Sequence, residues 1–129
     1  MELEEKIKLS ETRQFKMVFP CTLNANDSLF GGMAMQWMDE VAYITALRFT
    51  RKQMVTVSAD KIKFYLPIKS DSIIEIIGKV IHVGNAKIEI LVEIFSEEMY
   101  ENIREKAIEA TFVFAAVNID NKPIAIKLA

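Results

Sequence analysis

The sequence is poor in several residues whose abundance would mark a particular class of protein. Its 129 residues include one cysteine and one histidine, which excludes an intramolecular disulfide and any metal site built from several Cys and His ligands. The lone cysteine, Cys21, fits a reducing compartment, and we expect it to be a small buried thiol and not a nucleophile. His82 lies in an apolar run and is expected to have a structural role. We therefore predict no metal site.

An excess of charge of one sign and long apolar runs are also absent. Sixteen basic residues are dispersed among eighteen acidic ones, with a net charge of −2, so the chain has no basic stripe that would bind nucleic acid. No apolar run approaches the roughly 20 residues that cross a bilayer. Residues 1–8 mix charged and apolar side chains and do not resemble a secretory signal. We predict a cytoplasmic protein whose partners include neither nucleic acid nor a membrane.

What the sequence does contain is the composition of a globular protein. Hydrophobic residues make up 51% of the chain and charged residues 26%, which is typical of a folded protein and not of a disordered one. A length of 129 residues is enough for one buried core and too short for two ordinary domains. We predict a single domain spanning residues 1–129.

One long helix is predicted from about Gly32 to Lys52. Apolar residues recur there at spacings of three and four, and no proline interrupts them, which is the pattern of a helix. The apolar positions cover more than half of the circumference, and Asp39 lies at the edge of the narrower polar arc. Such a helix must be buried on most sides. Because no other helix is predicted, we expect a curved sheet to enclose it.

The remaining segments are predicted to be extended. We expect an extended N-terminal stretch with a strand at about 13–20, strands at about 55–66, 73–83, 86–94 and 107–119, a charged loop at 96–106, and an edge strand or tail at 124–128. The apolar phase changes near Asp60 and Lys61, which indicates a bulge. The predicted fold class is therefore α+β, with one long central helix wrapped by an antiparallel sheet of five or six strands.

One segment carries residues suited to chemistry. The loop Asn24-Ala25-Asn26-Asp27-Ser28 leads to Gly31-Gly32, and Trp37-Met38-Asp39-Glu40 follows. This order and spacing resemble the signature of the hotdog-fold acyl-CoA thioesterases, and the resemblance extends over nearly the whole chain. The chain departs from the family at Lys69-Ser70-Asp71, at Gly84 to Lys87 and at Phe49, where many members have a histidine.

The resemblance implies a hydrolase that converts an acyl-CoA to a free acid and coenzyme A. Coenzyme A is then part of the substrate and product, and no separate cofactor is expected. The family pattern also implies that the Asn loop and the helix acid of one site come from different subunits. The expected minimal active unit is therefore a homodimer, and a tetramer or hexamer built from dimers stays open.

The proposed catalytic residues are Asp39 and Asn24. A carboxylate that borders an apolar arc is costly to bury without a partner, so Asp39 is a candidate general base or nucleophile, with a solvated helix residue as the alternative. Asn24 could orient water or donate to the thioester carbonyl, or serve only the turn.

The oxyanion and substrate-binding candidates are Gly31, Gly32, Thr56 and Ser58. Backbone amides at a helix start have no intrahelical partner, and glycine lets a carbonyl approach them, although the pair could equally be a plain helix-start turn. Thr56 and Ser58 lie on the polar side of the predicted strand and are expected to border the site, or else to be surface hydroxyls. The alternative function is a non-catalytic acyl-CoA binding or sensing protein.

Overall fold

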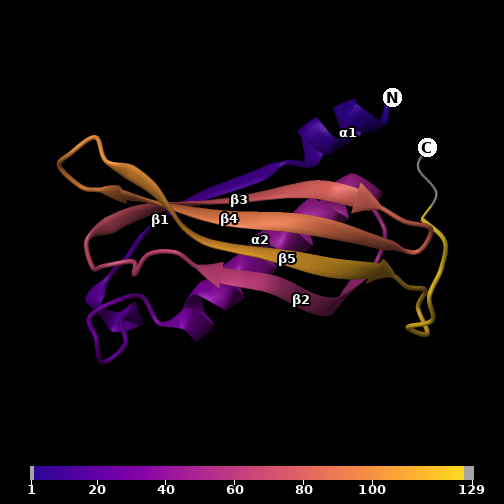
Figure 1. The fold of residues 1–129 in the computed structure, drawn as a ribbon. Helices are drawn as coiled ribbons and strands as arrows, with labels where there is room; N and C mark the ends of the chain where they lie inside the picture. The colour runs from indigo at the N-terminus through magenta and orange to yellow at the C-terminus, as the bar shows by residue number, and fades with distance from the viewer. Residues whose placement is uncertain (1, 127–129) are drawn as a thin grey trace.

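The computed structural model describes residues 2–126 and contains two α-helices, one short 3-10 helix and five strands in that range (Figure 1). In chain order the elements are α1 (Leu3–Ser10), β1 (Thr12–Met17), η1 (Pro20–Thr22), α2 (Gly31–Thr50), β2 (Met54–Phe64), β3 (Ser72–Val83), β4 (Lys87–Glu98) and β5 (Arg104–Ala116). Neither α-helix is long and apolar enough to cross a membrane.

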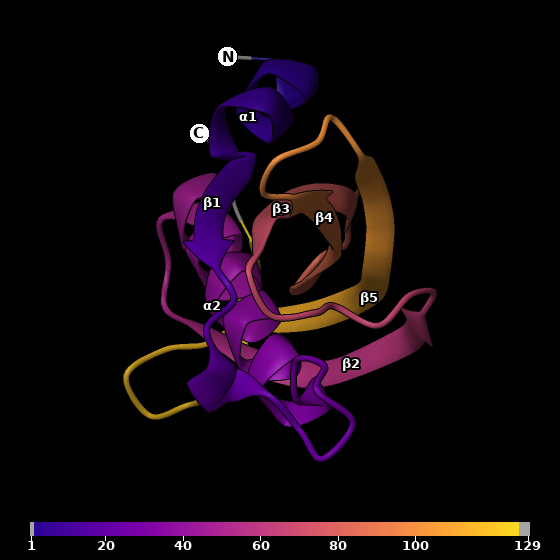
Figure 2. The same cartoon turned by 90° about the vertical axis from the view of Figure 1, so that its left-hand side faces the viewer.

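The strands form a single sheet in the order β1-β3-β4-β5-β2, and every neighbouring pair is antiparallel. Figure 2 looks along the strands and shows the sheet curving around α2. The long helix and the five-stranded antiparallel sheet confirm the predicted α+β hotdog architecture. β1 and β2 are the two edges, so β3, β4 and β5 are the interior strands.

The core lies between α2 and the concave face of the sheet. Alternate residues of the interior strands point inward and are fully buried, among them Ile74, Ile76, Ile90 and Phe114. The helix approaches β3 closely because Gly78 has no side chain. A Cβ atom at that position would lie 2.6 Å from Thr45 Oγ1 and 2.9 Å from Val41 Cγ1. Residues at other positions of α2 are left partly exposed, so one side of the helix is open.

The predicted change of phase in β2 is confirmed as two irregularities of its pairing with β5. The register shifts between Thr56 and Ser58 and again between Asp60 and Lys63, and Lys61 has a φ of 54°. Such bulges bend a strand and leave residues unpaired. Most of β2 is exposed, including apolar side chains of Val57 and Phe64.

Several details of the sequence prediction are wrong. The N-terminal stretch is not extended, because residues 3–10 form α1, whose Ile7 packs against the core. The predicted loop 96–106 is shorter, since β4 runs to Glu98 and β5 begins at Arg104. Cys21 is exposed and not buried, because it lies on η1 outside the core. Of the two alternatives left open for 124–128, the tail agrees with residues 124–126, which form no strand, and 127–128 lie outside the described residues.

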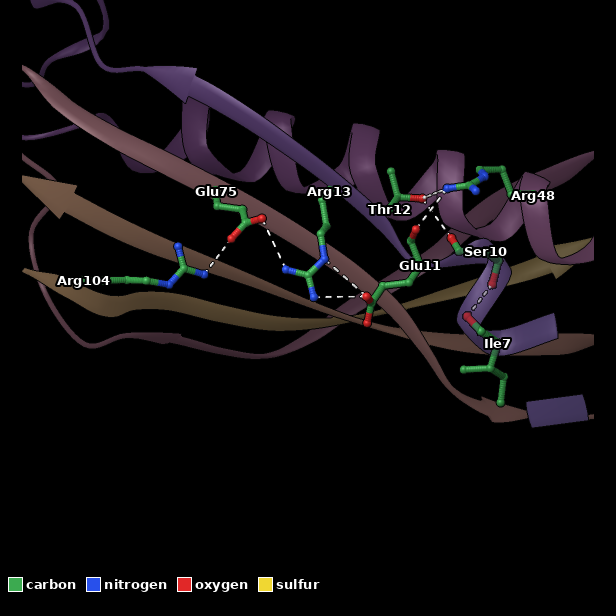
Figure 3. Close-up of polar contacts among 8 residues, drawn as sticks. All are labelled: Ile7, Ser10, Glu11, Thr12, Arg13, Arg48, Glu75 and Arg104. Carbon is green, nitrogen blue, oxygen red and sulfur yellow. Dashed lines mark hydrogen bonds and ion pairs between the residues drawn. The ribbon is translucent and has the colours of Figure 1, made fainter. Parts of the chain in front are cut away.

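Two sets of polar contacts fasten the N-terminal part of the chain to the rest (Figure 3). On β3, the Glu75 side chain is only 6% exposed and accepts hydrogen bonds from Arg13, at 3.3 Å, and Arg104, at 2.6 Å. On α2, the Arg48 guanidinium donates to the carbonyl oxygens of Leu9 and Glu11. These contacts tie β1 and the α1–β1 junction to the sheet and to α2.

Candidate active site

The Asn24 loop is held by its own hydrogen bonds. Asn24 Oδ1 accepts from the backbone N–H of Asn26, at 2.8 Å, and from both the N–H and the hydroxyl of Ser28, at 3.2 and 3.3 Å. The backbone N–H of Asn24 donates to Ser28 O at 2.8 Å. The carboxamide is therefore fixed through its oxygen. Its Nδ2 donates to no protein acceptor among residues 2–126, so Asn24 serves the turn and still offers a donor.

The start of α2 also offers unpaired donors. Phe30 is the N-cap and makes no side-chain cap, and its carbonyl accepts from both Met33 and Ala34. The preceding amides, those of Gly31 and Gly32, have no protein acceptor in the described part of the chain. A Cβ atom on Gly31 would come no closer than 3.8 Å to a heavy atom, the nearest being in Phe64. Space for a ligand atom therefore exists beside Gly31.

Asn24 and Gly31 open onto the same cavity, whose volume is about 390 Å³. Its lining is mostly apolar and comes from the Asn24 loop, the end of β2, the segment after it and β5: Asn24, Ser28, Leu29, Gly31, Phe64, Tyr65, Leu66, Pro67, Ile68 and Ile108. Residue spacing did not predict this set, because it is assembled from three distant parts of the sequence. The structure thus combines donor groups with an apolar wall.

Asp39 lies elsewhere on α2, on its open side. It is half-buried, and the hydroxyl of Thr56 donates to Asp39 Oδ1 at 3.2 Å across the gap between α2 and β2. Ser58 donates instead to Asp60 Oδ2 at 3.0 Å. The structure therefore brings Thr56 to Asp39 and does not bring Ser58 there.

Five of the six predicted residues fall into two groups within one chain, and Ser58 belongs to neither. Asn24, Gly31 and Gly32 form what we term the loop half-site, and Asp39 with Thr56 forms the helix half-site. Asp39 does not line the cavity beside Asn24. At about 1.5 Å per residue, it lies roughly 12 Å farther along the axis of α2 than Gly31. One chain therefore holds the donors and the carboxylate apart.

His82 and the acidic residues of the described range do not form an alternative catalytic or metal site. His82 is exposed on β3. No group of three or more His, Cys, Asp or Glu side chains between residues 2 and 126 is placed to hold a metal ion.

The sequence model of the thioesterase superfamily matches residues 26–103, which is more than half of the chain and includes the start of α2, Asp39 and Thr56. The chain belongs to the thioesterase superfamily. As a member of this superfamily it is similar to an uncharacterized acyl-CoA thioester hydrolase of Bacillus subtilis, with 31% identity over 92% of this chain and 69% of that protein.

Two solved structures are similar to this chain over 95% of its length. One is the acyl-CoA hydrolase from Staphylococcus aureus in complex with butyryl coenzyme A, coenzyme A and coenzyme A disulfide, with 30% identity, a TM-score of 0.89, and coverage of 95% of this chain and 74% of that one. The other is a hexameric acyl-CoA thioesterase without ligand, with 27% identity, a TM-score of 0.91, and coverage of 95% and 78%.

The Staphylococcus aureus enzyme is also represented by three variants in which an aspartate, a threonine or an asparagine is replaced by alanine. Their structures have TM-scores of 0.88, 0.88 and 0.89 to this chain. The three replaced positions are spaced along that protein as Asn24, Asp39 and Thr56 are spaced along this one.

Proposed function

We propose that this superfamily member hydrolyses acyl-CoA thioesters to a free carboxylic acid and coenzyme A. The similar proteins are named acyl-CoA hydrolases, and one of them binds butyryl coenzyme A. The observation that carries the proposal within this chain is the Asp39 carboxylate, oriented by Thr56 at 3.2 Å on the open side of the helix whose first amides are unpaired.

Each residue has a role in the proposed reaction. The Gly31 and Gly32 amides and Asn24 Nδ2 donate to the thioester oxygen, which becomes negative when the carbonyl carbon is attacked. Asp39 as general base removes a proton from the attacking water, or as nucleophile forms an anhydride that water then opens. In both routes the C–S bond breaks and coenzyme A leaves as the thiol after gaining a proton.

The proposed active site is shared between two chains. The loop half-site and helix half-site are too far apart to act on one carbonyl within a chain, so a second copy must supply the missing half. The edge strand β2 lies beside the helix half-site, and its exposed apolar side chains include Val55, Val57 and Ile62. An exposed, apolar edge strand is a surface that proteins normally cover. A twofold dimer formed along β2 would cover it and place two copies of each half-site at one interface.

The spacing of the substituted residues in the Staphylococcus aureus variants supports the choice of Asn24, Asp39 and Thr56. A higher oligomer built from dimers is consistent with the hexameric relative. The cytoplasmic location inferred from the sequence stays a prediction.

The competing function is binding or sensing of acyl-CoA without turnover. It would use the same cavity but would not need the carboxylate. A thioester hydratase is disfavoured, because His82 is exposed on β3 and does not line the cavity beside Asn24.

The test is an assay of free thiol released from acyl-CoAs of short, medium and long chain. We expect turnover by the wild-type protein and its loss in Asp39→Asn and Asn24→Ala. Asp120→Asn is the control and should keep full activity, because Asp120 lies in an exposed turn, does not line the cavity beside Asn24 and does not bond to Asp39. Undiminished turnover in Asp39→Asn would refute the mechanism. Binding of acyl-CoA without turnover by the wild-type protein would establish the sensing function instead.

A further inference from the structure

A second cavity, of about 250 Å³, lies between α1 and the C-terminal end of α2. Its lining consists of Lys6 and Leu9 from α1 and of Arg48, Phe49 and Arg51 from the end of α2. Three of these five residues are cationic and none is acidic. On a chain whose net charge is −2, this concentration of positive charge is local. Its lining shares no residue with the loop half-site or the helix half-site.

The Arg48 guanidinium is fixed in place before any ligand binds (Figure 3). Nη1 donates to Glu11 O at 3.0 Å and to Thr12 Oγ1 at 3.3 Å, and Nη2 donates to Leu9 O at 2.5 Å. A guanidinium has five N–H groups, so these contacts leave others for a ligand. Its partners are two carbonyl oxygens and a hydroxyl, so none of them balances its charge.

Lys6 and Arg51 have no ion-pair partner among the described residues 2–126. Cations at the end of a helix commonly balance the negative end of its dipole, which would explain their presence without a ligand. The cap itself uses the backbone and not the side chain of Arg51, because the Arg51 N–H donates to Leu47 O at 2.7 Å. Neither the Lys6 nor the Arg51 side chain forms an ion pair within residues 2–126, whereas Arg13, Arg104 and Lys106 do.

We propose that this basic cavity binds the phosphate groups of a nucleotide. Three cations around one small cavity repel one another, and a phosphate that lies among them relieves the repulsion while accepting charge-assisted hydrogen bonds. Leu9, which is 60% exposed, and Phe49 supply an apolar wall for the rest of the ligand. The nucleotide is either the end of a bound acyl-CoA or a free effector, and both present the same chemistry.

Direct binding tests the site without any assay of hydrolysis. The probe is adenosine 3′,5′-bisphosphate, titrated calorimetrically into the full-length protein. Lys6→Glu should weaken binding at least about tenfold, as expected for a lost hydrogen bond to a charged group. Lys8→Glu changes the net charge equally on the same helix but does not line the cavity, and it should bind as the wild type does.

Arg51→Gly is the second variant, because Arg51 has a φ of 55° and glycine adopts that conformation without strain. It removes the guanidinium and keeps the helix end, and it too should bind at least about tenfold more weakly. Absence of binding to the wild-type protein, or wild-type binding by both Lys6→Glu and Arg51→Gly, would overturn the proposal.

Substrate kinetics distinguishes the nucleotide end of an acyl-CoA from a free effector. This part of the test rests on the proposed hydrolysis. If the cavity holds the nucleotide end of the substrate, both variants raise the KM for acyl-CoA and leave the KM for the matching acyl-pantetheine unchanged. If it holds a free effector, both KM values stay as in the wild type although bisphosphate binding is lost. Lack of any hydrolysis with intact bisphosphate binding would refute the proposed function and leave the phosphate site standing.

Discussion

Thr56 and Asp39 are joined by one hydrogen bond between side chains of different elements. The Asp39 side chain has two rotatable bonds, and the hydrogen bond from Thr56 favours one orientation of its carboxylate. Alternation along a strand places Thr56 and Ser58 on the same face, and the sequence therefore predicted equivalent roles for them. The register shift between them pairs Thr56 with Phe114 and Ser58 with Val113, which separates the two hydroxyls. The family resemblance suggested Asn24 and Asp39 as candidates, but the residue spacing could not predict this difference between Thr56 and Ser58.

Thr56→Val keeps the shape of the side chain and removes the donor to Asp39. A hydrogen bond to a charged group contributes about 1.5–3 kcal/mol, so we expect kcat to fall roughly tenfold or more with little change in KM. Thr56→Ser restores the hydroxyl and should recover most of the rate. Steady-state kinetics with one acyl-CoA measures kcat and KM for both variants. A wild-type kcat in Thr56→Val would show that Thr56 does not orient the carboxylate.

Glu109 on β5 provides a test of the electrostatics outside the site. A hydrogen bond from Lys106 holds the pKa of Glu109 below its ordinary value, and the same contact raises the pKa of Lys106. A lowered carboxyl pKa contributes stability above the pKa of the unfolded chain, and that stability is lost as the pH falls through the folded pKa. In Lys106→Gln the pKa of Glu109 should therefore rise, as measured by NMR titration of its carboxyl carbon. The control is Lys79→Gln, which changes an exposed lysine of β3 and should leave the pKa of Glu109 unchanged. An unchanged Glu109 pKa in Lys106→Gln would contradict the pairing of Lys106 with Glu109.

At the scale of elements, the spacing of apolar residues predicted most of the secondary structure. It could do so because buried side chains recur with the period of the helix or strand that carries them. The interior strands and α2 were found within a few residues, since their apolar side chains face one core. α1 was missed because a helix of eight residues buries little more than Ile7 and Ser10. Its acidic first turn, with Glu4 and Glu5, and Lys8 in its last turn were the available signals.

The position of α2 on the sheet depends on Gly78. In Gly78→Ala the new methyl group would meet Thr45 Oγ1 at 2.6 Å and Val41 Cγ1 at 2.9 Å, and overpacking of this kind costs about 1–3 kcal/mol. We expect the free energy of unfolding in urea to fall by that amount. Thr45→Ala combined with Gly78→Ala should show a favourable coupling in a double-mutant cycle, because it removes the closer contact. Full stability of Gly78→Ala would show that the helix does not pack there as described.

At the scale of the whole molecule, one chain has two incomplete half-sites and an exposed edge strand beside one of them. The sequence could suggest a shared site only through a family resemblance, because periodicity and spacing within one chain carry no information about a second copy. The structure adds the separation of the loop half-site from Asp39, which lies farther along α2 than Gly31, and the uncovered apolar side chains of β2. We therefore expect light scattering after size-exclusion chromatography to give a mass of two chains or a multiple of two. A monomer with full activity would contradict the shared site.

The central claim is most directly tested by co-expressing Asn24→Ala and Asp39→Asn chains. Each variant alone should be inactive in thiol release. In a mixed dimer, one of the two sites combines the intact Asn24 of one chain with the intact Asp39 of the other, so random mixing should recover about a quarter of the wild-type activity per chain. If both catalytic residues of a site came from the same chain, every site would carry a defect, and the co-expressed protein would be as inactive as the separate variants.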